Sequence, residues 1–165
     1  MELNEKERLI LFNQYRILEK LYPEEEKECQ NAQKILAEGF EIEYDSLVEF
    51  MSDGIPIDIC KEVIDILQMY RSLYGSYHEL SDKTGIDKDN VIFQGFDGNE
   101  ETEHFIFACF YLEDLGRFSE FKDVEINSHS NRLYKYLPML NEWRKYGRYD
   151  TLSKEQIIKI ISAYK

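Results

Sequence analysis

The segment IDICKEVIDILQMYRSLYGSYHEL, residues 57–80, decides the fold class of this chain. Apolar residues recur in it every three or four positions, which is the spacing that gathers side chains on one face of an α-helix. The stripe consists of Cys60, Val63, Ile64, Leu67, Tyr70, Leu73, Tyr74 and Tyr77. Because the pattern continues over the whole segment, we expect one long helix with a single apolar face.

Helical periodicity also marks the segments before this helix. A helix is predicted over 3–22, where apolar residues cover more than one side. A second helix follows Pro23 and ends at Gly39, because proline suits the first turn of a helix and glycine its end. Asp45 is placed to act as the N-cap of a short third helix. The amino-terminal third of the chain is therefore predicted to be helical.

Three more helices are predicted after residue 97. The helix over 98–115 is apolar around most of its circumference, which indicates burial at the centre or at a contact with another subunit. The helix over 131–146 contains Pro138, which predicts a kink. Ser153 and Gln156 form a capping box at the start of the last helix.

Length and composition agree with this pattern. The chain has 165 residues, of which 43% are hydrophobic and 14% aromatic, enough for a packed core in one domain. Eight glycines and three prolines are too few for the many turns of a β-sandwich or barrel. We therefore predict an all-α, single-domain protein over residues 1–165, a bundle of about six or seven helices with little or no β-structure.

The cysteines and the apolar runs bear on the cellular compartment. Three cysteines lie far apart and form no C-x-x-C motif, which excludes a zinc ribbon and a dithiol redox site. The amino terminus, MELNEKER, lacks the apolar core of a signal peptide. The longest apolar run, FIFACFYL at 105–112, is far shorter than the roughly 18 residues that a membrane-spanning helix needs. We expect a cytoplasmic protein without a membrane segment.

The acidic segment DGNEETEH, residues 97–104, admits two interpretations. Glu101 and His104 have the Glu-x-x-His spacing of di-iron bundles, but those centres need two such motifs, so a metal site here would require a second subunit. The alternative is helix capping, with Asp97 as N-cap, Glu100 at the third helical position and flanking glycines that permit a tight turn with positive φ. We favour capping and predict no cofactor.

Residues 132–149 carry five basic residues and one acidic residue in a chain with a formal net charge of −13. The bases alternate with Tyr134, Tyr136, Trp143, Tyr146 and Tyr149. Such a segment could bind single-stranded nucleic acid, dock a second copy, or pack as a core helix; the net charge disfavours nucleic acid and anionic membranes. Because Trp and Arg are favoured interface anchors, the candidates for partner binding are Arg132, Lys135, Trp143, Arg144, Lys145 and Arg148.

Five blocks of sequence follow one another along the chain: RLILFNQYRIL at 8–18, VIDILQMYRSL at 63–73, FQGFDGNEE at 93–101, MLNEW at 139–143 and LSKEQIIKII at 152–161. Together they resemble the YfbU family of bacterial proteins over essentially the whole chain. The resemblance implies a compact, single-domain, mostly helical cytoplasmic protein. It implies no catalytic residues, because the biochemical role of that family is uncharacterised.

These observations favour a non-enzymatic interaction or regulatory module that forms homo-oligomers. The expectation of an oligomer rests on the apolar surplus of the helices over 3–22 and 98–115. Two alternatives stay open: a metal-dependent enzyme with a site near Glu101 and His104, and a nucleic-acid-binding protein that uses residues 132–149.

Overall fold

The computed structural model describes residues 1–148 and 150–165, and the chain divides into two compact units, residues 1–54 (unit 1) and 55–165 (unit 2). Each unit is helical. Among the described residues there is no strand, and the only β-type pairing is an isolated bridge between Phe96 and Asn127. The prediction of an all-α fold is confirmed, whereas the single domain predicted over 1–165 stays a prediction.

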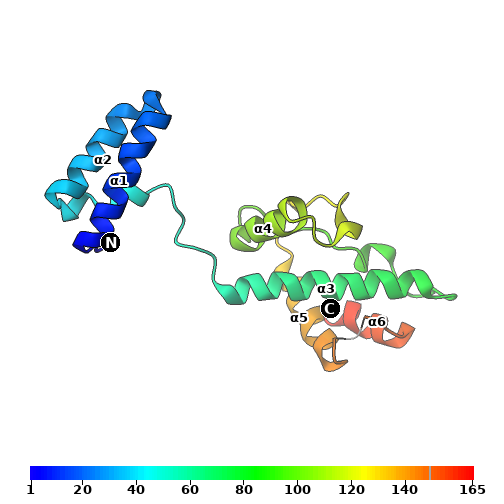
Figure 1. Cartoon of the computed structure of the whole chain (residues 1–165). Helices are drawn as coiled ribbons and strands as arrows, with labels where there is room; N and C mark the ends of the chain where they lie inside the picture. The colour runs from blue at the N-terminus through cyan, green and yellow to red at the C-terminus, as the bar shows by residue number, and fades with distance from the viewer. Residues whose placement is uncertain (149) are drawn as a thin grey trace. The chain divides into compact units, whose positions relative to one another are not determined.

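Unit 1 is a hairpin of two helices, α1 (Glu5–Leu21) and α2 (Glu26–Glu38), as Figure 1 shows. A 3-10 turn, Pro23–Glu25, joins them and places the proline in its first position. Gly39 ends α2 in the left-handed conformation with φ at 71°. The boundaries predicted from Pro23 and Gly39 are therefore confirmed.

The short helix predicted after Asp45 is not an α-helix. The chain forms two 3-10 turns there, Glu41–Glu43 and Asp45–Val48, and the Asp45 side chain caps neither of them. Its carboxylate instead binds the terminal ammonium group of Met1 at 2.5 Å. The prediction was wrong because this carboxylate has a partner 44 residues away in the sequence.

Unit 2 is built around α3 (Ile57–Glu79), the helix predicted over 57–80. Figure 1 shows α4 (Thr102–Cys109) on one side of α3, and α5 (Leu133–Lys145) and α6 (Lys154–Ser162) on the other side. Both α5 and α6 match predicted helices, and Pro138 lies inside α5 as expected.

The helix predicted over 98–115 is divided into segments of different geometry. Residues 98–101 form a turn, α4 follows, and the chain then continues as a π-helix over Phe110–Asp114. Two 3-10 turns complete the unit, one over Lys88–Asn90 and one over Ser119–Phe121.

An aromatic cluster lies at the centre of unit 2, between α3, the loop after residue 90 and α5. Neighbouring rings have centroids 5.2 to 5.9 Å apart, and the members are Tyr70, Phe93, Phe96 and Tyr136. The Tyr136 hydroxyl donates to the carbonyl oxygen of Gly95 at 3.0 Å and accepts from the backbone N–H of Gln94 at 3.2 Å. The buried polar tip of this ring is therefore satisfied.

The capping box predicted at the start of α6 is present. Ser153 Oγ accepts the backbone N–H of Gln156 at 3.3 Å, and Gln156 Oε1 accepts the backbone N–H of Ser153 at 2.8 Å. Leu152 and Ile157, which flank this start, are both buried in the core of unit 2. The last helix thus begins with a local signal that its own residues supply.

Candidate functional site

Glu101 is a buried carboxylate whose two oxygens bind backbone amides. Oε2 accepts the N–H of Asp97 at 2.8 Å, while Oε1 accepts the N–H of Arg132 at 2.6 Å and that of Leu133 at 2.5 Å. Only 3% of the residue is exposed. Leu133 is the first residue of α5, so this distant glutamate satisfies N–H groups at the start of that helix and places negative charge at its positive end.

Asp97 is also buried, and its side chain caps the turn that precedes α4. Oδ1 accepts from the backbone N–H of Asn99 at 2.8 Å and from that of Glu100 at 3.1 Å. Asp97 thus caps a turn and not the helix, because the N-cap residue of α4 is Glu101, and the prediction of Asp97 as the helix N-cap was wrong. The reciprocal bond to its own N–H comes from Glu101, however, and Glu100 is exposed. The role predicted for Glu100 at the third helical position is therefore not found.

The two glycines of this segment differ. Gly95 has φ at 78°, and a Cβ atom added there would lie 2.2 Å from the carbonyl oxygen of Ile126. Gly98 does not have a positive φ, which corrects the prediction for that residue; its neighbour is the Asn127 side chain. The geometry of the turn therefore depends on a close backbone approach at Gly95 rather than on two left-handed residues.

His104 faces a partner that the sequence did not indicate. Its Nε2 lies 2.9 Å from Oε1 of Glu62 on α3, and its ring centroid lies 5.5 Å from that of Phe96. The His104 side chain is 11% exposed. A carboxylate that holds one imidazole nitrogen fixes the ring orientation, which is the role of the third member in hydrolytic triads.

Glu101 and His104 therefore have different partners, although they lie only three positions apart at the start of α4. Glu101 satisfies backbone amides, and His104 pairs with Glu62. Within the part of the chain that the structure describes, no group of three or more His, Cys, Asp or Glu side chains is placed to hold a metal ion. A metal site at this pair would have to take further ligands from outside the described chain.

The basic segment predicted to bind partners is largely engaged within the chain. Arg144 and Arg148 each place Nη2 near Oδ2 of Asp65 on α3, at 2.7 and 2.9 Å. Lys145 pairs with Glu142 at 2.5 Å, one turn away on α5. These three cations are thus paired with two carboxylates of the same unit, although both arginines and Lys145 remain exposed.

Lys135 is the least accessible base of this segment, with 5% of the residue exposed. Its Nζ donates to Asn90 Oδ1 at 3.2 Å and lies 5.4 Å from the ring centroid of Tyr164. Burial lowers the pKa of Lys135, and the nearby Arg132 lowers it further, against the opposing effect of acidic residues in the 87–89 loop. This lysine therefore contacts Asn90 and the carboxyl-terminal Tyr164 within unit 2, and it is not available to an external partner.

Trp143 lies in the core with no exposed surface, next to the likewise buried Tyr136 and Met139. A partner cannot reach this indole unless the core opens, so the interface role predicted for it does not fit its position. Arg132 is partly buried at the start of α5. Tyr149, the last aromatic residue of the predicted segment, lies outside the described residues.

Large apolar side chains are exposed on α1. This helix has no buried residue, and Leu9, Ile10, Ile17 and Leu21 are each between 58% and 64% exposed. A smaller group lies on α4, the π-helix and the residue that follows it in unit 2, where Ile106, Phe110 and Leu115 are between 46% and 52% exposed. Both groups occur in helices whose sequences have apolar residues around more than one side.

The comparison with known proteins assigns the chain to a family. A model of the YfbU domain matches residues 1–163, which include both units. The chain belongs to the YfbU family. The UPF0304 protein MJECS11 of Methanocaldococcus jannaschii is similar to it, with 37% identity over 169 residues that cover 98% of this chain and 99% of that protein. The resemblance found in the sequence blocks is therefore confirmed for this YfbU-family chain.

Two further observations complete the description of this YfbU-family chain. No described helix has both the length and the apolar content needed to cross a membrane. Sequence reasoning did not find Glu62 and Asp65, the α3 acids that pair with His104 and with the α5 arginines. Their three-residue spacing makes them neighbours on α3, but it does not indicate which distant side chains they contact.

Proposed function

We propose that this YfbU-family protein is a non-enzymatic interaction module that self-associates through the exposed apolar face of α1. The observation that carries the proposal is the exposure of Ile10, Ile17 and Leu21. Their spacings of seven and four residues place them on one side of the helix. Contiguous apolar residues on a surface are typical of protein–protein contacts.

The small core of unit 1 supports this proposal. In these 54 residues the only buried hydrophobic side chains are those of Cys29, Ala32, Leu36 and Tyr44. A core of that size contributes little stabilisation, and natural units of this length commonly depend on association, disulfides or a metal. A second copy that covers the α1 face would remove apolar surface from water and stabilise the hairpin.

The cysteines fit a reducing compartment, and we propose that the protein acts in the cytoplasm. Cys29, Cys60 and Cys109 are all free thiols. Burial raises the pKa of Cys29, and nearby glutamates raise it further. Burial likewise raises the pKa of Cys109. Both thiols thus remain protonated and weakly nucleophilic, which also disfavours cysteine-based catalysis.

Light scattering coupled to size-exclusion chromatography tests the proposal. At micromolar concentration we expect a mass that is a multiple of the 19.8 kDa chain. Ile10→Glu and Ile17→Glu should shift it toward the monomer, because each buries a charge in the contact. Ile42→Glu is the matched control, since Ile42 is 90% exposed but lies off α1.

Two results would contradict the proposal. One is a monomer for the unmodified chain across the micromolar range. The other is an oligomer that Ile10→Glu and Ile17→Glu leave intact, because the contact would then lie elsewhere on the molecule. Circular dichroism of each variant verifies that the helices have formed before the mass is interpreted.

The alternatives receive less support from the geometry. Binding of single-stranded nucleic acid needs free cationic groups beside exposed aromatic rings. Among the described residues of the segment over 132–149, Arg144, Lys145 and Arg148 are paired with carboxylates, and Tyr134 is the one strongly exposed aromatic. A metal-dependent enzyme would need more ligands than His104 and Glu62 provide.

A further inference from the structure

A cavity of about 320 Å³ lies in unit 2 between the π-helix and the loop that follows it. Its apolar lining includes Leu112, Phe118, Phe121 and Val124, and the charged residues beside it are Glu113, Arg117 and Lys122. The volume is within the lower range of natural small-molecule sites, which are apolar hollows with a few placed polar groups. Self-association through α1 makes no use of this cavity.

Two unusual backbone conformations meet at this cavity, the π-helix and the left-handed Phe118. The π-helix over Phe110–Asp114 contributes Leu112 and Glu113 to the lining. Gly116 and Phe118 follow it with φ at 58° and 52°. A π-helix is rare and occurs often at functional sites, and a bulky residue in the left-handed region is a genuine outlier. Strained conformations of this kind persist where the surrounding structure holds them, and they cluster at ligand sites.

The strained Phe118 is held by contacts with Arg71 and Phe121. The guanidinium carbon of Arg71 lies 4.0 Å from the ring centroid, and the ring of Phe121 stacks at 6.0 Å with an interplanar angle of 9°. Arg71 in turn binds both carboxylate oxygens of Glu120, the residue before Phe121. The cavity wall is therefore fixed without a ligand, which reduces the ordering cost of binding.

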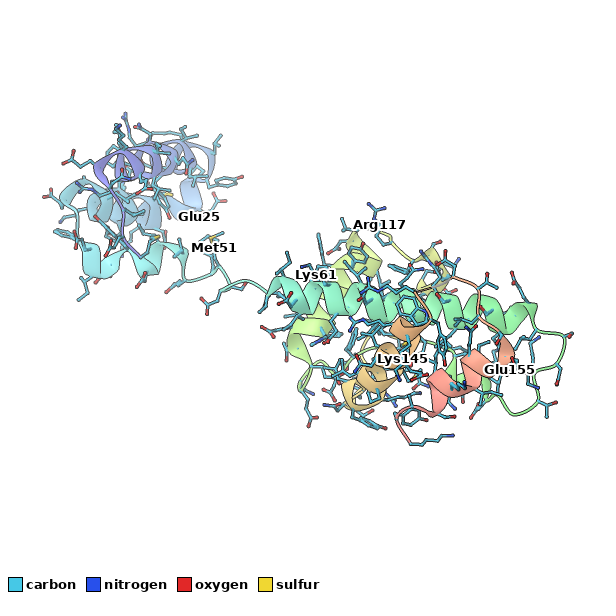
Figure 2. The ribbon with its side chains drawn as sticks, turned by 90° about the horizontal axis from the view of Figure 1, so that it is seen from below. Glu25, Met51, Lys61, Arg117, Lys145 and Glu155 are labelled. Atoms are coloured by element: carbon cyan, nitrogen blue, oxygen red, sulfur yellow. The ribbon has the colours of Figure 1, made fainter. Side chains whose placement is uncertain are left out.

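The charged groups at the cavity favour an anion. Arg117 and Lys122 are both exposed, and neither side chain takes part in any of the ion pairs or hydrogen bonds found within the described residues. Arg117 lies at the outer edge of unit 2 (Figure 2). Glu113 is the one acid of the lining, so the lining carries a net positive charge in a chain of net charge −13.

We propose that this cavity binds a small molecule with an apolar body and a carboxylate head group. The apolar body lies against Phe118, Phe121 and Val124, and the carboxylate faces Arg117 and Lys122. Burial of the body removes apolar surface from water, and the two cations select the anionic head over a neutral one.

Titration calorimetry with decanoate and with decanol, each below its aggregation limit, tests this proposal. We expect one decanoate per chain and weaker binding of decanol.

Two variants with matched controls locate the bound decanoate. Val124→Phe fills the cavity and should abolish decanoate binding, whereas Val48→Phe, the same change at a partly buried position of unit 1, should not. Lys122→Glu should weaken decanoate binding about threefold or more, as expected for an exposed charge pair, and leave decanol unaffected. The exposed Lys88→Glu is its matched control.

Three results would overturn the proposal: undiminished decanoate binding to Val124→Phe, unchanged decanoate binding to Lys122→Glu, or decanol that binds as tightly as decanoate. The first result would place decanoate on an exposed apolar surface such as α1. If Val124→Phe does not fold by circular dichroism, Lys122→Glu and the decanol comparison decide the question, because Lys122 is exposed and its replacement leaves the core intact.

Discussion

Phe96 donates its backbone N–H to the carbonyl oxygen of Ile126 at 2.9 Å, and its own carbonyl oxygen accepts the N–H of Ser128 at the same distance. This pairing brings the turn before α4 against the segment that leads to α5. Gly95 precedes the contact, and its missing side chain is what permits the approach, since a Cβ atom there would meet Ile126 at 2.2 Å.

We therefore expect Gly95→Ala to destabilise unit 2 by roughly 3 kcal/mol or more, through displacement of the Ile126 backbone. Gly85→Ala separates this effect from the left-handed conformation alone, because Gly85 has φ at 82° and open space around it. That control should cost about 1 kcal/mol. Urea unfolding followed by the fluorescence of Trp143 measures both. Equal losses in the two variants would mean that the close approach contributes nothing.

Glu101→Gln should destabilise the protein by about 1–3 kcal/mol, because an amide cannot accept three backbone N–H groups as a carboxylate does. Glu100→Gln is the neighbouring control and should change the free energy of unfolding by less than about 0.5 kcal/mol, since Glu100 is exposed. Urea unfolding followed by the fluorescence of Trp143 measures the free energy of unfolding of both variants. If Glu101 were a free ligand of a metal rather than a cap, its replacement would leave the stability of metal-free protein unchanged.

Lys135 predicts a pH dependence of stability. Its pKa is lowered in the folded chain, while the unfolded chain has a value of about 10.4. Between these two pKa values the unfolded state binds more protons, so the free energy of unfolding rises with pH. Lys135→Met removes this contribution. The stability of the unmodified chain relative to Lys135→Met should therefore increase from neutral pH toward pH 10, and a flat difference would contradict the prediction. The exposed Lys88→Met serves as the control.

The single domain predicted from the sequence requires both units to unfold together. Trp143 is the only tryptophan and lies in the core of unit 2, whereas far-ultraviolet circular dichroism reports helices of both units. We expect the two signals to change at the same urea concentration. Loss of part of the helical signal before the fluorescence changes would instead show that unit 1 unfolds by itself.

Local patterns predicted the helices of this chain because their causes lie within a few residues. The apolar spacing in 57–80 matches α3, and the capping box of Ser153 and Gln156 lies within one turn of α6. Pro23 and Gly39 also act through their own backbone conformations. Each of these features depends on contacts near in sequence, so the sequence alone was sufficient.

The details of the candidate sites depend on distant contacts and were not predictable in this way. The sequence offered Glu101 as a metal-ligand candidate beside His104, yet it binds amides 31 and 32 residues later. His104 pairs with Glu62, 42 residues earlier. Trp143 continues a stripe that includes Leu140, and burial rather than interface formation is the outcome of that stripe. A tryptophan is suited both to a protein core and to an interface, and only the packing of the folded chain decides between the two positions.

The cap that Glu101 provides also bears on the order of folding events. The Asn4 and Ser153 caps form within their own helices, α1 and α6, and close in a single turn. The start of α5 must instead wait until a loop of about 30 residues has closed, which costs chain entropy. We therefore predict that its amides are satisfied late, after the transition state of folding. Glu101→Gln should accordingly speed unfolding more than it slows refolding.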